Sequence, residues 1–249
     1  MLLPFKIVLP LFVFLFSMVG TRLAINVLFR RGVIDHPNSR SSHSHPTPRG
    51  GGIVLTTAAL TACLLIGNFS GSAGWPFFVI GGIGVILAGV SWIDDIRNLN
   101  PIIRLLAQGI AVGLTLYFVP LPGPIFAGLF PPYFDVLLAS VLWIWFINLF
   151  NFMDGIDGLA GVETIAISAG CFVISRKLGL GEPQMVLSLC LGAAALGFLR
   201  WNCNPAKIFL GDVGSVPLGY ILGWMLLQLA ASGAWIPAVI LPLYFFADA

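Results

Sequence analysis

The chain has very few charged residues. Only 12 Lys or Arg and 10 Asp or Glu occur among its 249 residues, so 9% of the sequence is charged, whereas soluble domains carry roughly 25%. Apolar residues make up 58%. A soluble protein of this length would be short of polar side chains to cover its surface. The composition therefore excludes an ordinary soluble domain and predicts a polytopic membrane protein.

Basic runs and cysteine motifs are absent too, and the first apolar run does not have the pattern expected of a cleaved leader. The net charge is +2, and the chain has no run of basic residues that would bind nucleic acid. No nucleic-acid partner is therefore expected. The four cysteines form no CxxC or Cys/His spacing, and we expect buried apolar side chains. They are Cys63, Cys171, Cys190 and Cys203. No basic stretch precedes the first apolar run and no small-residue cleavage site follows it, which predicts a membrane helix rather than a signal peptide.

Nine apolar runs are candidates for membrane spans. A spanning helix needs about 20 mostly apolar residues, and these runs do not alternate as the strands of a membrane barrel do. They lie at residues 5–28, 51–69, 76–93, 102–119, 135–151, 158–175, 184–200, 214–231 and 234–249. We therefore expect an all-α, polytopic integral membrane protein. It would have about nine transmembrane helices in a single domain over residues 1–249.

The basic residues predict an orientation. If the N-terminus lies outside, nine Lys or Arg residues fall on the cytoplasmic side and three on the outer side, as the positive-inside rule favours. Four polar clusters then share the cytoplasmic side. They are residues 40–52, Asp94-Asp95, residues 148–157 and residues 209–215. A carboxylate near lipid costs roughly 2.5–3.5 kcal/mol on insertion scales, so several on one side predict a site for cations or phosphates.

Adjacent carboxylates follow the third apolar run. Asp94 and Asp95 repel one another, so both stay ionised only when a cation or a basic group compensates them. A Mg²⁺ ion shared with substrate phosphates would do this. The alternative is a solvated helix end paired with Arg97.

Four polar residues recur every three positions in NLFNFMDGID. Asn148, Asn151, Asp154 and Asp157 would lie along one face of a helix. Gly155 and Gly158 indicate that the helix loosens there and that its end can approach a ligand. Ordinary turn residues would explain the DG step but not two asparagines in an apolar run. The pattern favours a functional site.

Two further segments combine glycine with polar residues. In FLGDVGS, Asp212 lies between glycines at a helix entrance. There it could cap the helix, or it could bind a metal while the helix N-terminus admits phosphate. Residues 35–52 hold all three histidines, and the His43-x-His45 spacing could bind zinc, but no third ligand is evident and a solvated loop is favoured. The arginines and glycines of this segment suit phosphate better.

Together, four ordered segments resemble those of a known family. RSSHSHPTPRGGG, DDIRNLNPIIRLLAQ, NLFNFMDGIDGLAG and PAKIFLGDVGSVPLG are similar to the motifs of the polyprenyl-phosphate N-acetylhexosamine-1-phosphate transferases, of the glycosyltransferase family 4 type. PTPRGGG and DDIRNLNP are closest to the branch that initiates O-antigen synthesis. The resemblance covers nearly the whole chain. It implies a multi-pass enzyme of the bacterial inner membrane whose active site faces the cytoplasm.

The resemblance also implies a reaction and a cofactor. Undecaprenyl phosphate would attack the β-phosphorus of a UDP-N-acetylhexosamine, release UMP and give a polyprenyl-diphosphate sugar. This is the first membrane step of O-antigen or other cell-envelope polysaccharide synthesis. The implied cofactor is Mg²⁺, with Mn²⁺ as an alternative.

Residue roles follow from the same resemblance. Asp212 and Asn151 are expected to be metal ligands. The expected catalytic residues are Asp94, Asp95, Asp154 and Asp157. Substrate contacts are expected from Arg40, Thr47, Arg49, Asn148, Gly211 and Ser215.

Two rival interpretations stay open. A secondary transporter would place charges near mid-membrane, often in repeated halves, whereas these lie at one edge and no internal repeat is evident. The chain stops inside an apolar run at residues 245–249, before the histidine-rich loop and further helix that the family usually carries. We therefore expect a domain that lacks its C-terminal loop and last helix, and an inactive or fragmentary relative is the second alternative.

Overall fold

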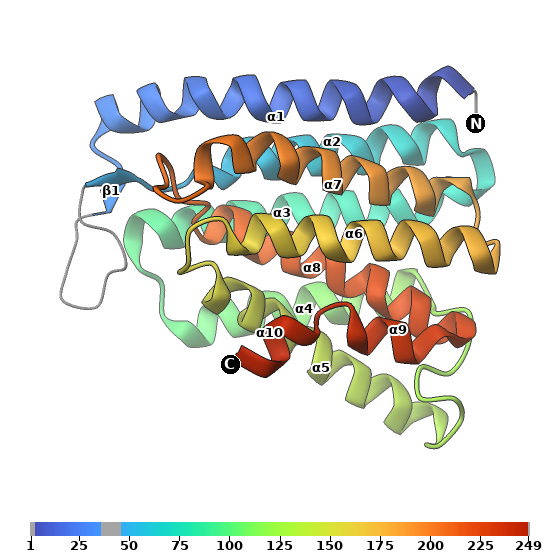
Figure 1. Cartoon of the computed structure of the whole chain (residues 1–249). Helices are drawn as coiled ribbons and strands as arrows, with labels where there is room; N and C mark the ends of the chain where they lie inside the picture. The colour runs from blue at the N-terminus through green and yellow to red at the C-terminus, as the bar shows by residue number, and fades with distance from the viewer. Residues whose placement is uncertain (1–2, 36–45, 249) are drawn as a thin grey trace.

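The fold is a bundle of long helices with one short β-pair, seen here in a computed structural model that describes residues 3–35 and 46–248 (Figure 1). The helices are α1 (Leu3–Arg31), α2 (Gly52–Phe69), α3 (Trp75–Arg97), α4 (Pro101–Phe118), α5 (Pro132–Met153), α6 (Leu159–Leu178), α7 (Glu182–Asn202), α8 (Asp212–Leu229), α9 (Trp235–Ile240) and α10 (Leu243–Asp248). A 3-10 turn covers Gly71–Gly74 and a π-helical turn covers Ala230–Ala234. Strands β1 (Ile34–Asp35) and β2 (Thr47–Pro48) pair antiparallel.

Eight helical segments of the described chain are long and apolar enough to cross a membrane, which confirms the all-α polytopic prediction but not the count of nine. The run at residues 234–249 forms α9 and α10, which have six residues each. A six-residue helix rises about 9 Å, far less than the roughly 30 Å of hydrocarbon. The prediction rested on hydropathy, which depends only on composition. It could not detect the turn at Gly233 (φ 91°) or the break between α9 and α10, because these depend on backbone geometry.

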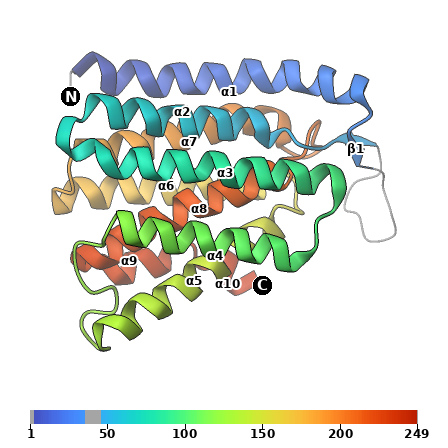
Figure 2. The ribbon, with the colours of Figure 1, turned by 180° about the vertical axis from the view of Figure 1, so that it is seen from behind.

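All the described polar clusters lie at one end of the bundle. The helices alternate in direction, so the end of α3, the start of α4, the end of α5 and the start of α8 meet at the left of Figure 1. The α2–α3, α4–α5 and α6–α7 connections lie at the other side, and Figure 2 shows the same arrangement from behind. We call these the polar end and the opposite end. The prediction that the clusters share one side is confirmed, while the membrane face to which that side belongs stays a prediction.

Helix α8 is the centre of the bundle. Every residue from 212 to 226 is buried, and the helix packs against α2, α3, α5 and α6. Glycines let the neighbours approach: a Cβ atom on Gly223 would lie 2.3 Å from Trp143 Cδ1, and small residues serve this purpose in membrane bundles. Three cysteines are buried as expected, but Cys203 is exposed, because it follows the last residue of α7. The core thus fixes the N-terminus of α8, where Asp212 lies, at the polar end.

Candidate active site

The PTPRGGG and FLGDVGS segments run side by side at the polar end. The Phe209 amide donates to the Pro48 carbonyl at 2.8 Å, and the Gly52 amide donates to the Leu210 carbonyl at 2.8 Å. A Cβ atom on Gly52 would lie 2.3 Å from the Cα of Gly214. Only glycine permits so close an approach of two backbones. Part of the glycine run is therefore required for packing α2 against α8, whatever ligand it also contacts.

The turn between α3 and α4 places the carboxylate of Asp94 next to α4. Helix α3 ends at Arg97, and Asn98 then adopts the left-handed conformation with φ 50°. The turn lets the Leu99 amide donate to Asp94 Oδ1 at 2.6 Å. The other carboxylate oxygen contacts Arg104 Nη1 at 3.0 Å. Asp94 is thus held at a helix junction with an arginine across from it.

Asp95 holds the start of α8. Its two oxygens accept the backbone amides of Asp212 at 3.1 Å and Val213 at 2.9 Å. Arg49 Nη2 lies 3.0 Å from Asp95 Oδ1. The first amides of a helix have no partner within the helix, and they form its positive end. The Asp95 side chain is 1% exposed, so this carboxylate is occupied by backbone and arginine contacts.

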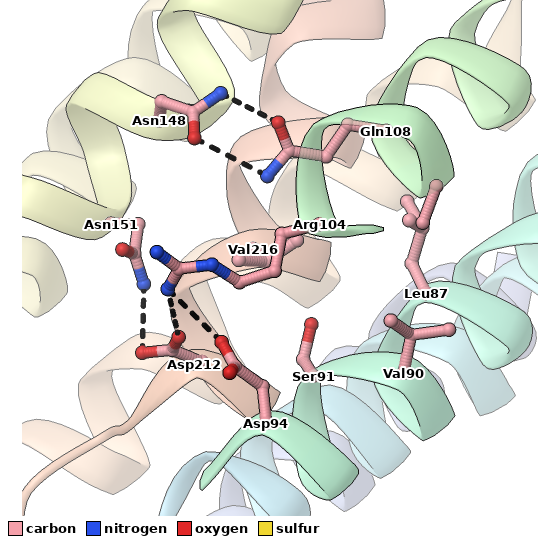
Figure 3. Close-up of a pocket in the computed structure, with 11 residues that line it drawn as sticks. Leu87, Val90, Ser91, Asp94, Arg104, Gln108, Asn148, Asn151, Asp212 and Val216 are labelled. Atoms are coloured by element: carbon pink, nitrogen blue, oxygen red, sulfur yellow. Dashed lines mark hydrogen bonds and ion pairs between the residues drawn. The ribbon is translucent and has the colours of Figure 1, made fainter. Parts of the chain in front are cut away.

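Asp212 is the centre of the site (Figure 3). Its Oδ1 lies 3.0 Å from both Arg49 Nη2 and Asn151 Nδ2. Its Oδ2 lies 3.4 Å from Arg104 Nη1. Asn151 also donates to Ser215 Oγ at 2.7 Å, which ties α5 to α8. Asp212 is therefore approached by side chains from α4, α5 and the segment before α2.

The charges gathered around Asp212 shift the pKa values of Arg49 and Asp154. Burial by itself would lower the pKa of Arg49, but the charges of Asp95 and Asp212 outweigh it and raise the pKa above its usual value. Arg49 therefore stays a cation. Burial, together with the charge of Asp212, raises the pKa of Asp154 well above its usual value, and a hydrogen bond from the Gly211 amide only partly opposes the shift. Asp154 therefore holds a proton more readily than a solvated aspartate.

The cluster has more acidic than basic groups. It contains Asp94, Asp95, Asp154 and Asp212 against Arg49 and Arg104. With all four carboxylates ionised two negative charges are uncompensated, and with Asp154 protonated one is. A divalent cation would balance this surplus. Carboxylate and amide oxygens are ligands that suit Mg²⁺. Among the described residues, no three or more His, Cys, Asp or Glu side chains form a ready metal cluster, so substrate oxygens would have to complete the coordination, as they commonly do for Mg²⁺.

A cavity opens beside these side chains. An outer part of about 180 Å³ is lined by Arg49, Asp94, Asn98, Leu99, Arg104 and Asp212. An inner part of about 40 Å³ reaches between α3, α4, α5 and α8 toward the side chains of Leu87 and Val90 (Figure 3). The polar groups therefore line an entrance whose deeper walls are partly apolar.

Most of the expected site residues meet in this network. They are Asp94, Asp95, Asn151, Asp154, Gly211, Asp212, Ser215 and Arg49. Asp157 lies differently, since its Oδ2 accepts the Ala206 amide at 2.9 Å and so holds the α7–α8 connection. Thr47 is buried in β2. Arg40, His43 and His45 lie outside the described residues.

Two residues of the site were not expected from the sequence. Arg104 bridges Asp94 and Asp212, and Gln108 forms a reciprocal amide pair with Asn148. Both belong to α4, four residues apart, so they share one face. Polar residues at that spacing in an apolar helix are the signal that could have found them. The expected substrate-binding residue Asn148 thus forms the inner wall of the cavity with Gln108.

The chain is similar in sequence to proteins of one known family. A model of glycosyl transferase family 4 matches residues 77–230, a stretch that includes both Asp94 and Asp212. The chain is 33% identical over 216 residues to a decaprenyl-phosphate N-acetylglucosaminephosphotransferase of Mycolicibacterium smegmatis, covering 78% of this chain and 52% of the relative.

Two other relatives carry related names. A probable undecaprenyl-phosphate N-acetylglucosaminyl 1-phosphate transferase of Bacillus subtilis is 32% identical over 223 residues, covering 86% of this chain and 59% of the relative. A phospho-N-acetylmuramoyl-pentapeptide-transferase of Campylobacter lari is 32% identical over 225 residues, covering 76% and 62%. The chain thus spans between half and two thirds of the length of these relatives.

Proposed function

The chain belongs to glycosyl transferase family 4, and from this premise we propose that it transfers a sugar 1-phosphate from a nucleotide sugar to a polyprenyl phosphate. In the finer form of the proposal, the donor is a UDP-N-acetylhexosamine, the acceptor is undecaprenyl phosphate and UMP is released. The product would be the first lipid intermediate of O-antigen or another cell-envelope polysaccharide. The enzyme would lie in the bacterial inner membrane with its polar end facing the cytoplasm.

One observation carries the proposal: two arginines and two aspartates that pair with them line a cavity at the end of membrane-length helices. A lipid phosphate can keep its tail in hydrocarbon while its charged group reaches this end of the bundle. A secondary transporter would place its charges near mid-membrane. The same arrangement therefore favours a reaction at the membrane edge over passage through the membrane.

The chemistry requires charge compensation more than proton removal. A phosphate monoester has a second pKa of about 6, so a lipid phosphate is largely dianionic at neutral pH. A phosphate oxygen attacks the β-phosphorus of the donor, and the bond from that phosphorus to the bridging oxygen breaks. UMP leaves with the electron pair on that oxygen. Repulsion between the two anions is the main obstacle, and guanidinium groups reduce it.

Each charged residue of the site has its own role in this reaction. Arg49 and Arg104 are the cations that face the cavity and that bind and orient the phosphates. Mg²⁺, or Mn²⁺ in its place, would be held by Asp212, Asn151 and Asp94 and would supply positive charge opposite the diphosphate. Asp95 acts as a positioning residue, because both of its oxygens are bonded to α8 amides. Asp94 faces the cavity and contacts substrate or metal rather than forming a covalent intermediate.

The experiment is an exchange assay in membranes that contain the full chain. Radiolabelled UMP should exchange into a UDP-sugar only when polyprenyl phosphate and Mg²⁺ are present, and a panel of UDP-sugars identifies the donor. Asp212→Asn should reduce exchange by about 100-fold to 1000-fold, on the scale of removing a central charge-stabilising group. Glu182→Gln, at the opposite end, is the matched control and should retain activity. Solute uptake by vesicles without any lipid-linked product would overturn the proposal.

A further inference from the structure

Three cations converge on one indole ring outside the active site. Arg22 of α1 and Arg200 of α7 place their Cζ atoms 5.9 and 5.1 Å from the ring centroid of Trp201. Lys207, in the α7–α8 connection, places its Nζ 5.7 Å from the same centroid. A ring has two faces, so at least two of the three cations lie over the same face. Cation–π attraction holds each of them near the ring.

The ring itself is anchored. Trp201 Nε1 donates to the Met18 carbonyl of α1 at 2.8 Å, and the Trp201 carbonyl accepts the Lys207 amide at 2.8 Å. The helices are also close, since a Cβ atom on Gly197 would lie 2.5 Å from the Phe14 carbonyl oxygen. The three cations therefore extend from an ordered junction of α1, α7 and the following loop.

Within residues 3–35 and 46–248, no carboxylate forms an ion pair with the cations of this cluster. Among the described residues, ion pairs join Lys6 to Glu182 and join Arg49 and Arg104 to the active-site aspartates, and none reaches the cations around Trp201. All three cationic side chains are exposed. Like charges brought together repel unless an anion lies between them. An anion from outside the chain would complete the cluster.

The surroundings point to a lipid as the source of that anion. Helix α1 has 29 residues, about 43 Å, which exceeds the roughly 30 Å of hydrocarbon. A helix of this length reaches past the hydrocarbon into the headgroup layer, and Arg22 lies nine residues before its end. Tryptophan prefers the membrane interface. Exposed apolar side chains flank the cations on their own helices, namely Leu23 on α1 and Leu196, one turn from Arg200, on α7 (60% and 54% exposed).

We propose that Arg22, Arg200 and Lys207 around Trp201 bind the phosphate group of an anionic phospholipid, whose acyl chains lie against the apolar surface of α1 and α7. Arginine and lysine near a membrane surface attract anionic lipids, and the guanidinium group matches phosphate oxygens. Neither α1 nor α7 contributes a side chain to the cavity of Figure 3. The lipid site is therefore separate from the active site, although Lys207 lies only five residues before Asp212.

The test is lipid binding to the purified full chain, followed by native mass spectrometry in detergent. Phosphatidylglycerol should bind more tightly than phosphatidylcholine. Combining Arg200→Gln with Lys207→Gln should weaken phosphatidylglycerol binding by about fivefold for each cation removed. Arg30→Gln with Arg31→Gln removes the same charge at the end of α1 and should retain binding. Arg200→Lys keeps the charge and should lose less than Arg200→Gln.

Three outcomes would overturn the proposal. The first is equal binding of the two lipids, and the second is an equal loss in the control pair. The third is full competition by free glycerol 1-phosphate, which would show an anion site without a lipid preference. Thermal unfolding in detergent without added lipid checks the fold, and the two double variants should unfold within a few degrees of the parent.

Discussion

Each end of the bundle has a buried aspartate that accepts two backbone amides, but only the polar end has a charged cavity beside it. At the polar end Asp95 accepts the amides of Asp212 and Val213, and at the opposite end Asp135 accepts the amides of Ile125 and Phe126 at 2.9 and 3.1 Å. Asp135 is 3% exposed and no cation of the described chain pairs with it. A buried carboxylate at a helix end is thus no proof of a reactive site, since it can simply satisfy backbone donors.

What distinguishes the polar end is surplus charge beside a cavity. Asp94 and Asp212 contact the same arginine, Arg104, and they line both parts of the cavity. The opposite end has a pocket too, next to Asp135, but the rest of that lining is apolar residues, proline and glycine. Within the adjacent pair, then, Asp95 resembles Asp135 and Asp94 resembles Asp212.

The largest difference in activity between the paired aspartates is expected from neutralising Asp94, whose carboxylate faces the cavity. Asp94→Asn keeps an oxygen that can accept the Leu99 amide but removes the charge. We expect a loss of at least about 100-fold in kcat, because a charged group at the reacting phosphates is lost, with little change in unfolding temperature. Exchange kinetics and thermal unfolding in detergent measure the two effects. Full activity in this variant would assign Asp94 to structure alone and erase its difference from Asp95.

Smaller effects, similar in size for the two variants, are expected on stability when Asp95 or Asp135 is neutralised. Asp95→Asn and Asp135→Asn each leave one backbone amide facing an NH₂ group, which should lower the free energy of unfolding by about 1–3 kcal/mol. Only Asp95→Asn should also lower activity, because its carboxylate positions Asp212 and Arg49. Thermal unfolding of both variants, followed by the exchange assay, tests this. A comparable loss of activity in Asp135→Asn would contradict the division between the two ends.

The sequence predicted the parts of the structure that depend on local pattern. Long apolar runs predict helices because backbone donors must be satisfied within the membrane, and alternation of direction then gathers the polar clusters at one end. The sequence could not show that Asp94 and Asp95 have different roles, because these roles depend on which helix each side chain contacts. Neither did it assign Arg104, whose partners lie on α3 and α8. The predicted ninth spanning helix is wrong because the last apolar run, which begins just after the turn at Gly233, is divided by a break between α9 and α10.

The smallest effects are expected from two polar pairs on the same face of α4. Gln108 pairs with Asn148 at the cavity, while Thr115 pairs with Tyr220 at 2.6 Å in the buried core. Gln108→Leu removes a cavity wall that orients Asn148, so we expect activity to fall by roughly threefold to tenfold, in line with about 1 kcal/mol for one hydrogen bond. Thr115→Val should cost a similar free energy of unfolding and leave activity unchanged. Steady-state kinetics and thermal unfolding of both variants decide between these results. If Thr115→Val lowers activity as much as Gln108→Leu does, the boundary between the reactive end and the structural core lies deeper in the bundle than the cavity indicates.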